Sequence, residues 1–330
     1  MTTEIKETET SKFIDGIPPM NYGENKDNTF VRSVQLSLNA LGENYSYDYL
    51  MGITGAAFRI QFDPGWCPSS ADATCGFDVS HEIFKSAGYS ARFKRINHNS
   101  FQDIKDLYSE IKIQIDLGRP VVAINLMGDM EWGIITGYLK NEPGLLCRTF
   151  NDESKEYSIA KHAPWLNFFI SDKIPDFTQS NLFTRSLKIA IMLAETRKFE
   201  EYYSGFAAYD KWIEKIRQLA ERSKSNDLQH TMEIHFILWN ALLDARRAAF
   251  NYLLREDTDK TIINGPQIIE CYSKIVRLLE NPPKVSGKVP ESDPAAGIQE
   301  MIRNQAEVLE RVYATEQEAI HLIERNLTDQ

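Results

Sequence analysis

The chain has 330 residues, of which 42% are hydrophobic, and this is enough to bury one large core or two ordinary ones. Its 47 acidic residues outnumber its 37 basic ones, and the formal charge of −10 argues against a dominant surface for nucleic acid or anionic membranes. No stretch approaches the roughly 18 to 20 apolar residues of a membrane span, and MTTEIKETETSK lacks the apolar run of a signal peptide, so we expect a cytoplasmic, two-domain protein.

The chain is predicted to begin with a polar arm, followed by two helices. Residues 1–16 are polar and lack apolar periodicity, so we expect a mobile N-terminal arm. Residues 28–41 carry apolar side chains at helical spacing, and Gly42 supplies a stop. A second, short helix begins at Ser46 and runs into the small-residue segment 52–58, whose composition indicates close packing of backbone against backbone.

The pattern then alternates between strands, helices and a long loop. Residues 59–62 predict a strand and residues 63–76 a turn-rich loop of a length that often carries function. Further along, the sequence predicts helices at 79–87 and 100–117 and strands at 90–93, 120–126, 132–138 and 144–150.

From about residue 180 the periodicity is helical, in the stretches 182–220, 229–255 and 295–327, and the prolines of 281–294 separate the last helix from its neighbour. We therefore predict an α+β protein with an α/β domain at 17–178, built on a central antiparallel sheet, and an all-helical domain at 179–330. In the second domain, the aromatic run from Phe199 to Trp212 is typical of a helix core. Arg246 and Arg247 lie near Asp244 and Glu256, which favours solvated ion pairs over an anion site.

Several segments of the first domain together resemble a known family. They are Asn28-Thr29-Phe30 opening a helix that closes at Leu41-Gly42, the small-residue segment 52–58, and Glu131-Trp132-Gly133 leading to Gly137-Tyr138. Their order and spacing resemble the papain-like cysteine-peptidase superfamily, most closely the N-terminal domain type named after the butirosin biosynthesis protein H, whose C-terminal companion is also helical. The resemblance covers roughly residues 17–175 and implies the papain-like fold for that domain.

The resemblance also implies three site positions. Papain-like folds place a cysteine at the start of the first helix, a histidine on a strand, and an Asp or Asn that orients the histidine ring. In this chain the cysteine position falls on Thr29, the histidine position on Glu131, and the orienting position on Asn151 or Asp152. The expected catalytic positions are therefore Thr29, Glu131 and Asp152, a degenerate version of the triad.

These replacements make cysteine-protease chemistry improbable. A threonine hydroxyl is a poor nucleophile without a strong neighbouring base, and a glutamate with its ordinary pKa is a weak base at pH 7. Burial beside Trp132 would raise the pKa of Glu131 and make it a usable acid or base. Two simpler interpretations remain open: Thr29 as an ordinary cap of its helix, and Glu131-Trp132 as the solvated rim of a hairpin.

The four cysteines are too few and too scattered for a disulfide framework, and Cys67 and Cys75 lack the spacing of zinc ligands. We expect reduced thiols, no metal and no cofactor. Cys67 and Cys75 are also candidates for a relocated nucleophile, although Asp63, Asp72 and Asp78 nearby would raise a thiol pKa and reduce its reactivity. The residues expected to contact a ligand are Asn28, Trp66, Cys67, Trp132 and Asn151.

Three functions follow as hypotheses. The first is a catalytically degenerate papain-like protein that binds a small molecule, a peptide or a ligand linked to a carrier protein in the cleft between the two domains. The second is a biosynthetic enzyme of acyl transfer or amide-bond chemistry that works through Glu131 or a loop cysteine. The third is a structural protein that forms a homodimer through Val308, Val312 and their neighbours.

Overall fold

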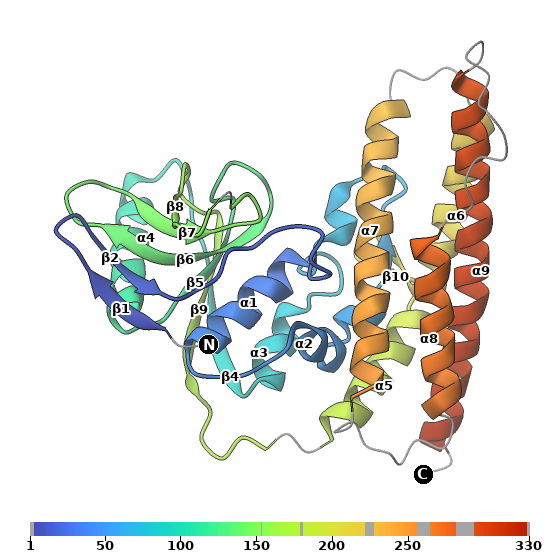
Figure 1. Cartoon of the computed structure of the whole chain (residues 1–330), viewed down its shortest axis with the longest axis horizontal. Coiled ribbons are helices and arrows are strands. Elements are labelled where there is room, and N and C mark those ends of the chain that lie inside the picture. Colours follow the sequence, from blue (N-terminus) through green and yellow to red (C-terminus); the bar gives the residue numbers. More distant parts are fainter. Residues whose placement is uncertain are drawn as a thin grey trace. The chain divides into compact units, whose positions relative to one another are not determined.

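The computed structural model describes residues 3–152, 154–178, 181–221, 228–255, 265–281 and 294–328. The protein is of the α+β class, with an N-terminal antiparallel sheet region followed by a helical C-terminal part. The chain divides into two compact units (Figure 1). The sheet unit contains Met1–Leu50 and Ser80–Gln179, and the helical unit contains Met51–Val79 and Ser180–Gln330.

The sheet unit is built on an eight-stranded sheet in which every pairing is antiparallel. The main path runs β1-β2-β6-β5-β9-β4, with β7 on the other side of β6 and β8 beyond it. The strands are β1 (Glu4–Glu7), β2 (Ser11–Asp15), β4 (Tyr89–Arg95), β5 (Val121–Ile124), β6 (Trp132–Leu139), β7 (Leu145–Arg148), β8 (Ser158–Ile159) and β9 (Leu166–Lys173). The sequence prediction omitted β8 and β9.

Helices α1 (Thr29–Ala40) and α4 (Phe101–Asp116) pack on β5 and β6, while α3 (Ser80–Ser86) packs on β4. Strand β5 is buried along its whole length, because helices and neighbouring strands cover it. Leu36 of α1, Ile111 of α4 and Ile135 of β6 belong to one apolar cluster with it. This core fixes the start of α1 against β6, which is where the predicted site positions lie.

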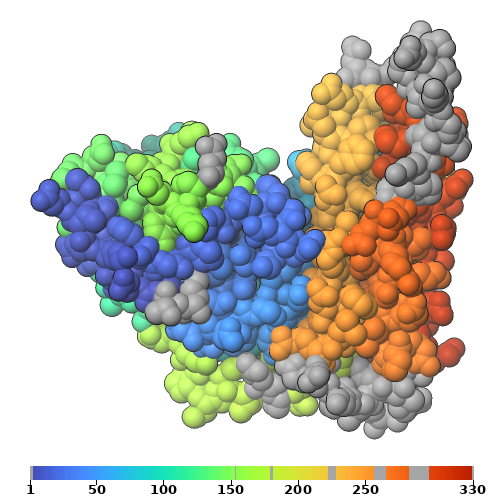
Figure 2. Space-filling model, in the orientation of Figure 1, coloured from blue at the N-terminus to red at the C-terminus, as the bar shows by residue number. Residues whose placement is uncertain are grey.

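The expected mobile arm at 1–16 is instead part of the sheet. Strands β1 and β2 form an antiparallel hairpin, and β2 continues the sheet by pairing Ser11 with Leu139 and Phe13 with Gly137. Figure 2 shows this hairpin in dark blue at the surface of the sheet unit. The prediction was wrong because the segment has few apolar residues of its own, although Ile14 is buried in the core.

The helical unit contains α5 (Leu182–Glu195), α6 (Gly205–Glu221), α7 (Leu228–Leu253), α8 (Gly265–Glu280) and α9 (Pro294–Thr328). Helix α9 packs against α5, α6 and α8, and α7 packs against α8. The single helical stretch predicted at 182–220 is interrupted, because β10 (Lys198–Phe199) and β11 (Tyr202–Ser204) form a small sheet with β3 (Gln61–Phe62). The second unit is therefore not all-helical. The predicted break at 281–294 lies largely outside the described residues.

Residues 51–79 were predicted to belong to the α/β domain, but they pack in the helical unit. This segment includes the end of α2 (Tyr47–Ile53), two short 3-10 helices at Ala56–Phe58 and Pro68–Ala71, and β3. A methyl group on Gly52 would lie 2.1 Å from a ring carbon of Tyr252 in α7, and one on Gly55 would lie 2.4 Å from Ile189 in α5. The small residues therefore do serve close packing, as predicted, but against helices far away in the sequence.

Three side chains of the helical unit for which the sequence predicted a role, Arg246, Val308 and Val312, are buried. Arg246 is fully buried and paired with Glu316 at 2.6 Å, so it is not the solvated residue expected, whereas Arg247 pairs with the exposed Glu280 at 2.7 Å. Val308 and Val312, expected at a dimer interface, are 1% and 0% exposed within the single chain. A homodimer through these two side chains would first require the helices to separate.

Candidate functional site

The N-terminus of α1 is capped by Asn28. Its side-chain oxygen accepts a hydrogen bond from Val31 N at 3.0 Å, and its backbone N–H donates to the Tyr47 hydroxyl at 2.9 Å. This arrangement satisfies one of the free amides that every helix start leaves, which is why asparagine is favoured there. Asn28, predicted to contact a ligand, is thus engaged in capping, and Thr29 becomes the first helical residue rather than the cap.

Thr29 lies next to the start of β6. Its hydroxyl accepts a hydrogen bond from Trp132 N at 3.4 Å, so the position matched to the catalytic cysteine and the segment matched to the histidine meet in space. The Trp132 ring is 1% exposed and packs edge-on against Phe30, with ring centroids 5.0 Å apart. Trp132 is therefore a core residue, and a ligand at the surface does not reach its indole.

Glu131, the residue before Trp132, points its carboxylate at Tyr22. The Tyr22 hydroxyl hydrogen-bonds Glu131, and its ring packs on Phe150 at 4.7 Å. Partial burial raises the pKa of Tyr22, and the negative charges of Glu131, Asp129 and Asp27 raise it further. We call these four residues, Tyr22, Asp27, Asp129 and Glu131, the acidic rim. Tyr22 is 50% exposed, so the rim is open to solvent.

The segment after β7 joins the acidic rim through Asn151 but not through the carboxylate of Asp152. Asn151 donates a side-chain hydrogen bond to Asp129, and its backbone forms an isolated bridge with Asn21. The Asp152 carboxylate accepts from Met20 N at 3.3 Å and from Thr149 N at 3.2 Å, and it lies 3.6 Å from the Arg148 guanidinium. Burial raises the pKa of Asp152, partly offset by these partners. Asp152 holds two backbone segments together.

The structure thus brings Thr29, Glu131, Trp132 and Asn151 to one end of β6, with a hydroxyl, a carboxylate and an amide but without a thiol or an imidazole in the matched positions. This group of side chains is suited to hydrogen bonding and to attracting positive charge. No sequence pattern assigned a role to Tyr22 or to Asp129. The turn-forming residues around Tyr22, Pro18-Pro19 and Gly23, were the one available signal of a structured loop beside the site.

The other two predicted ligand residues, Trp66 and Cys67, belong to the helical unit. Trp66 packs edge-on against Phe62 at 5.1 Å and joins the apolar cluster that contains Ile216 and Met232, so it has a core role. Cys67 lies 2.8 Å from the Ser69 hydroxyl. Burial raises the pKa of the neighbouring Cys75 to about 11, with Asp72 contributing, as the acidic surroundings had predicted.

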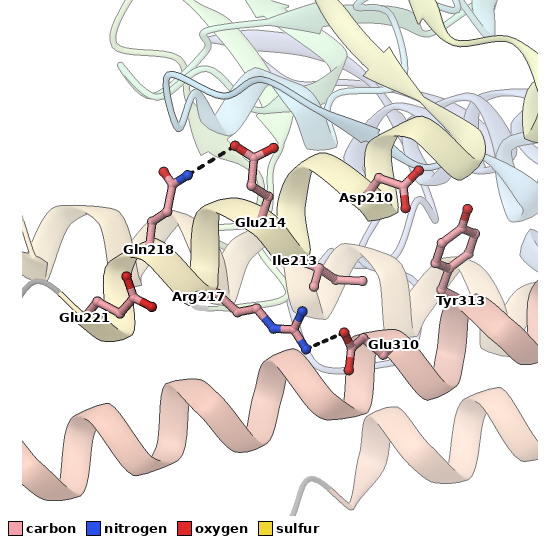
Figure 3. Close-up of a pocket in the computed structure, with 8 residues that line it drawn as sticks. All are labelled: Asp210, Ile213, Glu214, Arg217, Gln218, Glu221, Glu310 and Tyr313. Atoms are coloured by element: carbon pink, nitrogen blue, oxygen red, sulfur yellow. Dashed lines mark hydrogen bonds and ion pairs between the residues drawn. The ribbon is translucent and has the colours of Figure 1, made fainter.

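A pocket of about 410 Å³ lies between α6 and α9 in the helical unit (Figure 3). Arg217 and Glu310 point toward one another and form an ion pair, and Gln218 hydrogen-bonds Glu214 at 3.1 Å. Charged side chains that line the pocket are therefore already engaged by other side chains of its lining. The pocket is lined by Asp210, Ile213, Glu214, Arg217, Gln218, Glu221, Glu310 and Tyr313.

The described residues contain no group of three or more His, Cys, Asp or Glu side chains placed to hold a metal ion. Within the same ranges, every helix is too short or too polar to cross a membrane. Comparison with models of protein families finds no match, and neither does comparison with curated proteins.

Proposed function

We propose that the sheet unit is a catalytically degenerate papain-like domain that binds a ligand at the acidic rim. The ligand is a small molecule, a peptide or a group linked to a carrier protein. The order of elements supports the papain-like assignment, since a capped first helix packs on antiparallel strands and begins beside Trp132, the first residue of β6 and the one after Glu131.

The environment of Asp152 carries the argument against catalysis. A triad needs a nucleophile, a base and a third group that orients the base. Here the Asp152 carboxylate accepts hydrogen bonds from two backbone amides and faces Arg148, and Glu131 instead pairs with Tyr22. The Thr29 hydroxyl accepts from a backbone amide. These contacts favour a binding site over an acyl-transfer site.

The charge of the rim indicates what kind of ligand it binds. Asp27, Asp129 and Glu131 all act on the Tyr22 hydroxyl, so their negative potentials add at one place. The half-exposed Tyr22 ring, which packs on the buried Phe150, supplies an aromatic face beside them. Carboxylates next to an aromatic face attract amines and guanidinium groups through charge and cation–π interactions. The preferred ligand is therefore a cationic small molecule or a basic peptide segment.

Calorimetric titration tests this with spermidine and with a short lysine-rich peptide as probes. We expect binding to wild type that weakens about two- to fivefold in Glu131→Gln, the effect of removing one partly exposed charge. Glu142→Gln is the matched control, because Glu142 is an exposed carboxylate in the turn after β6 and outside the rim. Equal weakening in both variants would mean that the probes respond only to net charge and that the rim is not the site.

The enzyme alternative is tested with an acyl thioester and a nitrophenyl ester as substrates. We expect hydrolysis at the background rate for wild type, Glu131→Gln and Cys67→Ser alike. Turnover by wild type that is lost in either variant would replace the binding proposal with acyl transfer.

A further inference from the structure

The loop at 63–78 in the helical unit carries two thiols that the proposed function does not use. Cys67 and Cys75 are partly exposed, whereas Cys147 and Cys271 are buried, so the loop thiols are the pair open to reagents in solution. The loop contains the short 3-10 helix Pro68–Ala71, and Cys67 is the residue before it. A series of turns and one buried arginine set the shape of the loop.

Three successive turns fold the chain between the two cysteines. Ser70 N donates to Cys67 O at 3.2 Å, Asp72 N donates to Ser69 O at 3.0 Å, and Cys75 N donates to Asp72 O at 3.3 Å. Each such turn brings residues three apart to within about 7 Å. The intervening residues are therefore compact rather than extended.

Arg59 holds the loop in this shape through hydrogen bonds to its backbone. Its buried guanidinium donates to Asp72 O at 2.7 Å, Cys75 O at 2.8 Å and Ser70 O at 3.3 Å. Burial lowers the pKa of Arg59 to about 10, so the guanidinium stays charged at neutral pH. The side chain of Arg59 thus holds three backbone carbonyls of the loop, those of Ser70, Asp72 and Cys75.

The two thiols share a pair of hydroxyl groups. Cys67 Sγ lies 2.8 Å from Ser69 Oγ, and Ser69 Oγ lies 2.8 Å from the Tyr202 hydroxyl. The same Tyr202 hydroxyl hydrogen-bonds Cys75. Cys67 and Cys75 therefore flank one Ser69–Tyr202 pair, each one hydrogen bond away from it.

We propose that Cys67 and Cys75 are a redox-modification site, at which a peroxide converts the two thiols into an intramolecular disulfide. Cys67 attacks an oxygen of hydrogen peroxide, the O–O bond breaks, and Cys67 sulfenic acid and one water form. The Cys75 sulfur then attacks the Cys67 sulfur, the S–O bond breaks, and a second water leaves with the Cys75 proton. Two thiols and one peroxide thus give one disulfide and two waters.

The environment of Cys75 assigns it to the second step of the proposed reaction. Burial and Asp72 raise the pKa of Cys75 to about 11, which keeps it protonated and slow to react with peroxide at neutral pH. Cys75 is therefore the resolving thiol, and Cys67 is the one that meets the oxidant. Closure of the disulfide accelerates as pH rises toward the pKa of Cys75, since the thiolate is the attacking form.

Peptide mapping of the full-length protein under non-reducing conditions tests the proposal directly. After treatment with dilute hydrogen peroxide, we expect a Cys67–Cys75 cross-linked peptide that disappears with dithiothreitol, while Cys147 and Cys271 stay reduced as internal controls. Sulfinic acid on Cys67 with Cys75 still free, or disulfide-linked dimers in its place, would overturn the proposal. This measurement needs no variant, so it does not depend on the folding of one.

Two variants separate the assigned roles. In Cys75→Ser, we expect Cys67 sulfenic acid to persist and to be captured by dimedone. In Cys67→Ser, Cys75 should remain free at the same peroxide dose. The reverse pattern, with Cys75 captured and Cys67 unreactive, would contradict the order of the two steps. Circular dichroism confirms that each variant is folded before oxidation.

Discussion

His235 shows at the residue scale how a buried polar group is accommodated in the helical unit. It is fully buried, its Nδ1 accepts from Trp212 Nε1 at 3.1 Å, and its Nε2 lies 3.0 Å from Gln305 Oε1. Because Gln305 Oε1 accepts only, His235 carries its proton on Nε2 and is neutral. Burial lowers the pKa of His235 to about 4, which a hydrogen bond to Gln305 partly opposes.

This depressed pKa predicts a loss of stability in acid. The unfolded chain binds a proton at His235 near its ordinary pKa of 6.5, whereas the folded chain does so only near 4. The contribution is therefore complete above pH 6.5 and is lost as pH falls from 6.5 to about 4, by on the order of 3 kcal/mol. Urea unfolding of wild type and His235→Gln at pH 7 and pH 5 measures it. An equal loss in both proteins would assign the acid sensitivity to other groups.

The sequence predicted the candidate site only in part. The resemblance to papain-like domains matched Thr29 and Glu131 to the cysteine and histidine positions, and the Thr29–Trp132 hydrogen bond joins their two segments. The sequence pattern did not predict that the Asp152 carboxylate would accept hydrogen bonds from the backbone amides of Met20 and Thr149, because those contacts depend on how distant loops cross. The Tyr22–Glu131 pair was missed for the same reason.

At the scale of elements, local periodicity predicted most of the long helices and missed the edges of the sheet. Helices α4 and α9 each bury one face, and this leaves a regular apolar spacing that a sequence reveals. Helix α1 is buried at every residue except Asn39, and its apolar residues still recur at helical spacing. The β1–β2 hairpin has no such pattern, since β1 is exposed throughout and is held by pairing with β2. The break between α5 and α6 follows from pairing with β3, which lies more than a hundred residues earlier.

Arg246 connects elements that are distant in sequence, and its removal tests that connection. It binds Glu316 of α9 and donates to the carbonyls of Ala57 at 2.9 Å and Arg59 at 3.1 Å. Arg246→Met leaves a buried carboxylate and two carbonyls without this partner, so we expect a loss of about 3–5 kcal/mol in the free energy of unfolding. Arg247→Met, which removes a partly exposed pair, should cost less than about 1 kcal/mol.

Urea denaturation of both variants measures the difference. The double variant Arg246→Met with Glu316→Leu should recover part of the loss, because it no longer buries an unpaired charge. If Arg246→Met and Arg247→Met cost the same, the buried network does not hold the 57–59 segment to the helices.

At the scale of the whole molecule, the two units are interleaved along the chain. The helical unit takes residues 51–79 from between α1 and α3 of the sheet unit, so neither unit is a continuous piece of sequence. Composition placed the domain boundary near residue 178 and missed this exchange, because the segment's partners are visible only in the fold. The Phe58 ring packs edge-on against Tyr272 with ring centroids 5.7 Å apart, and the Phe62 ring stacks on Trp212 with centroids 6.1 Å apart.

A fragment containing only residues 180–330 should therefore fold poorly, although it includes every long helix of the helical unit. Without residues 51–79 it loses the aromatic partners of Tyr272 and Trp212, the strand that pairs with β11, and two acceptors of Arg246. We expect helical far-ultraviolet circular dichroism but weak near-ultraviolet signal and dye binding, the properties of a loosely packed state. A fragment in which residues 51–79 are joined to 180–330 by a flexible linker should regain a cooperative unfolding transition. Equal cooperativity in both fragments would show that the segment rests on the helices without contributing to their core.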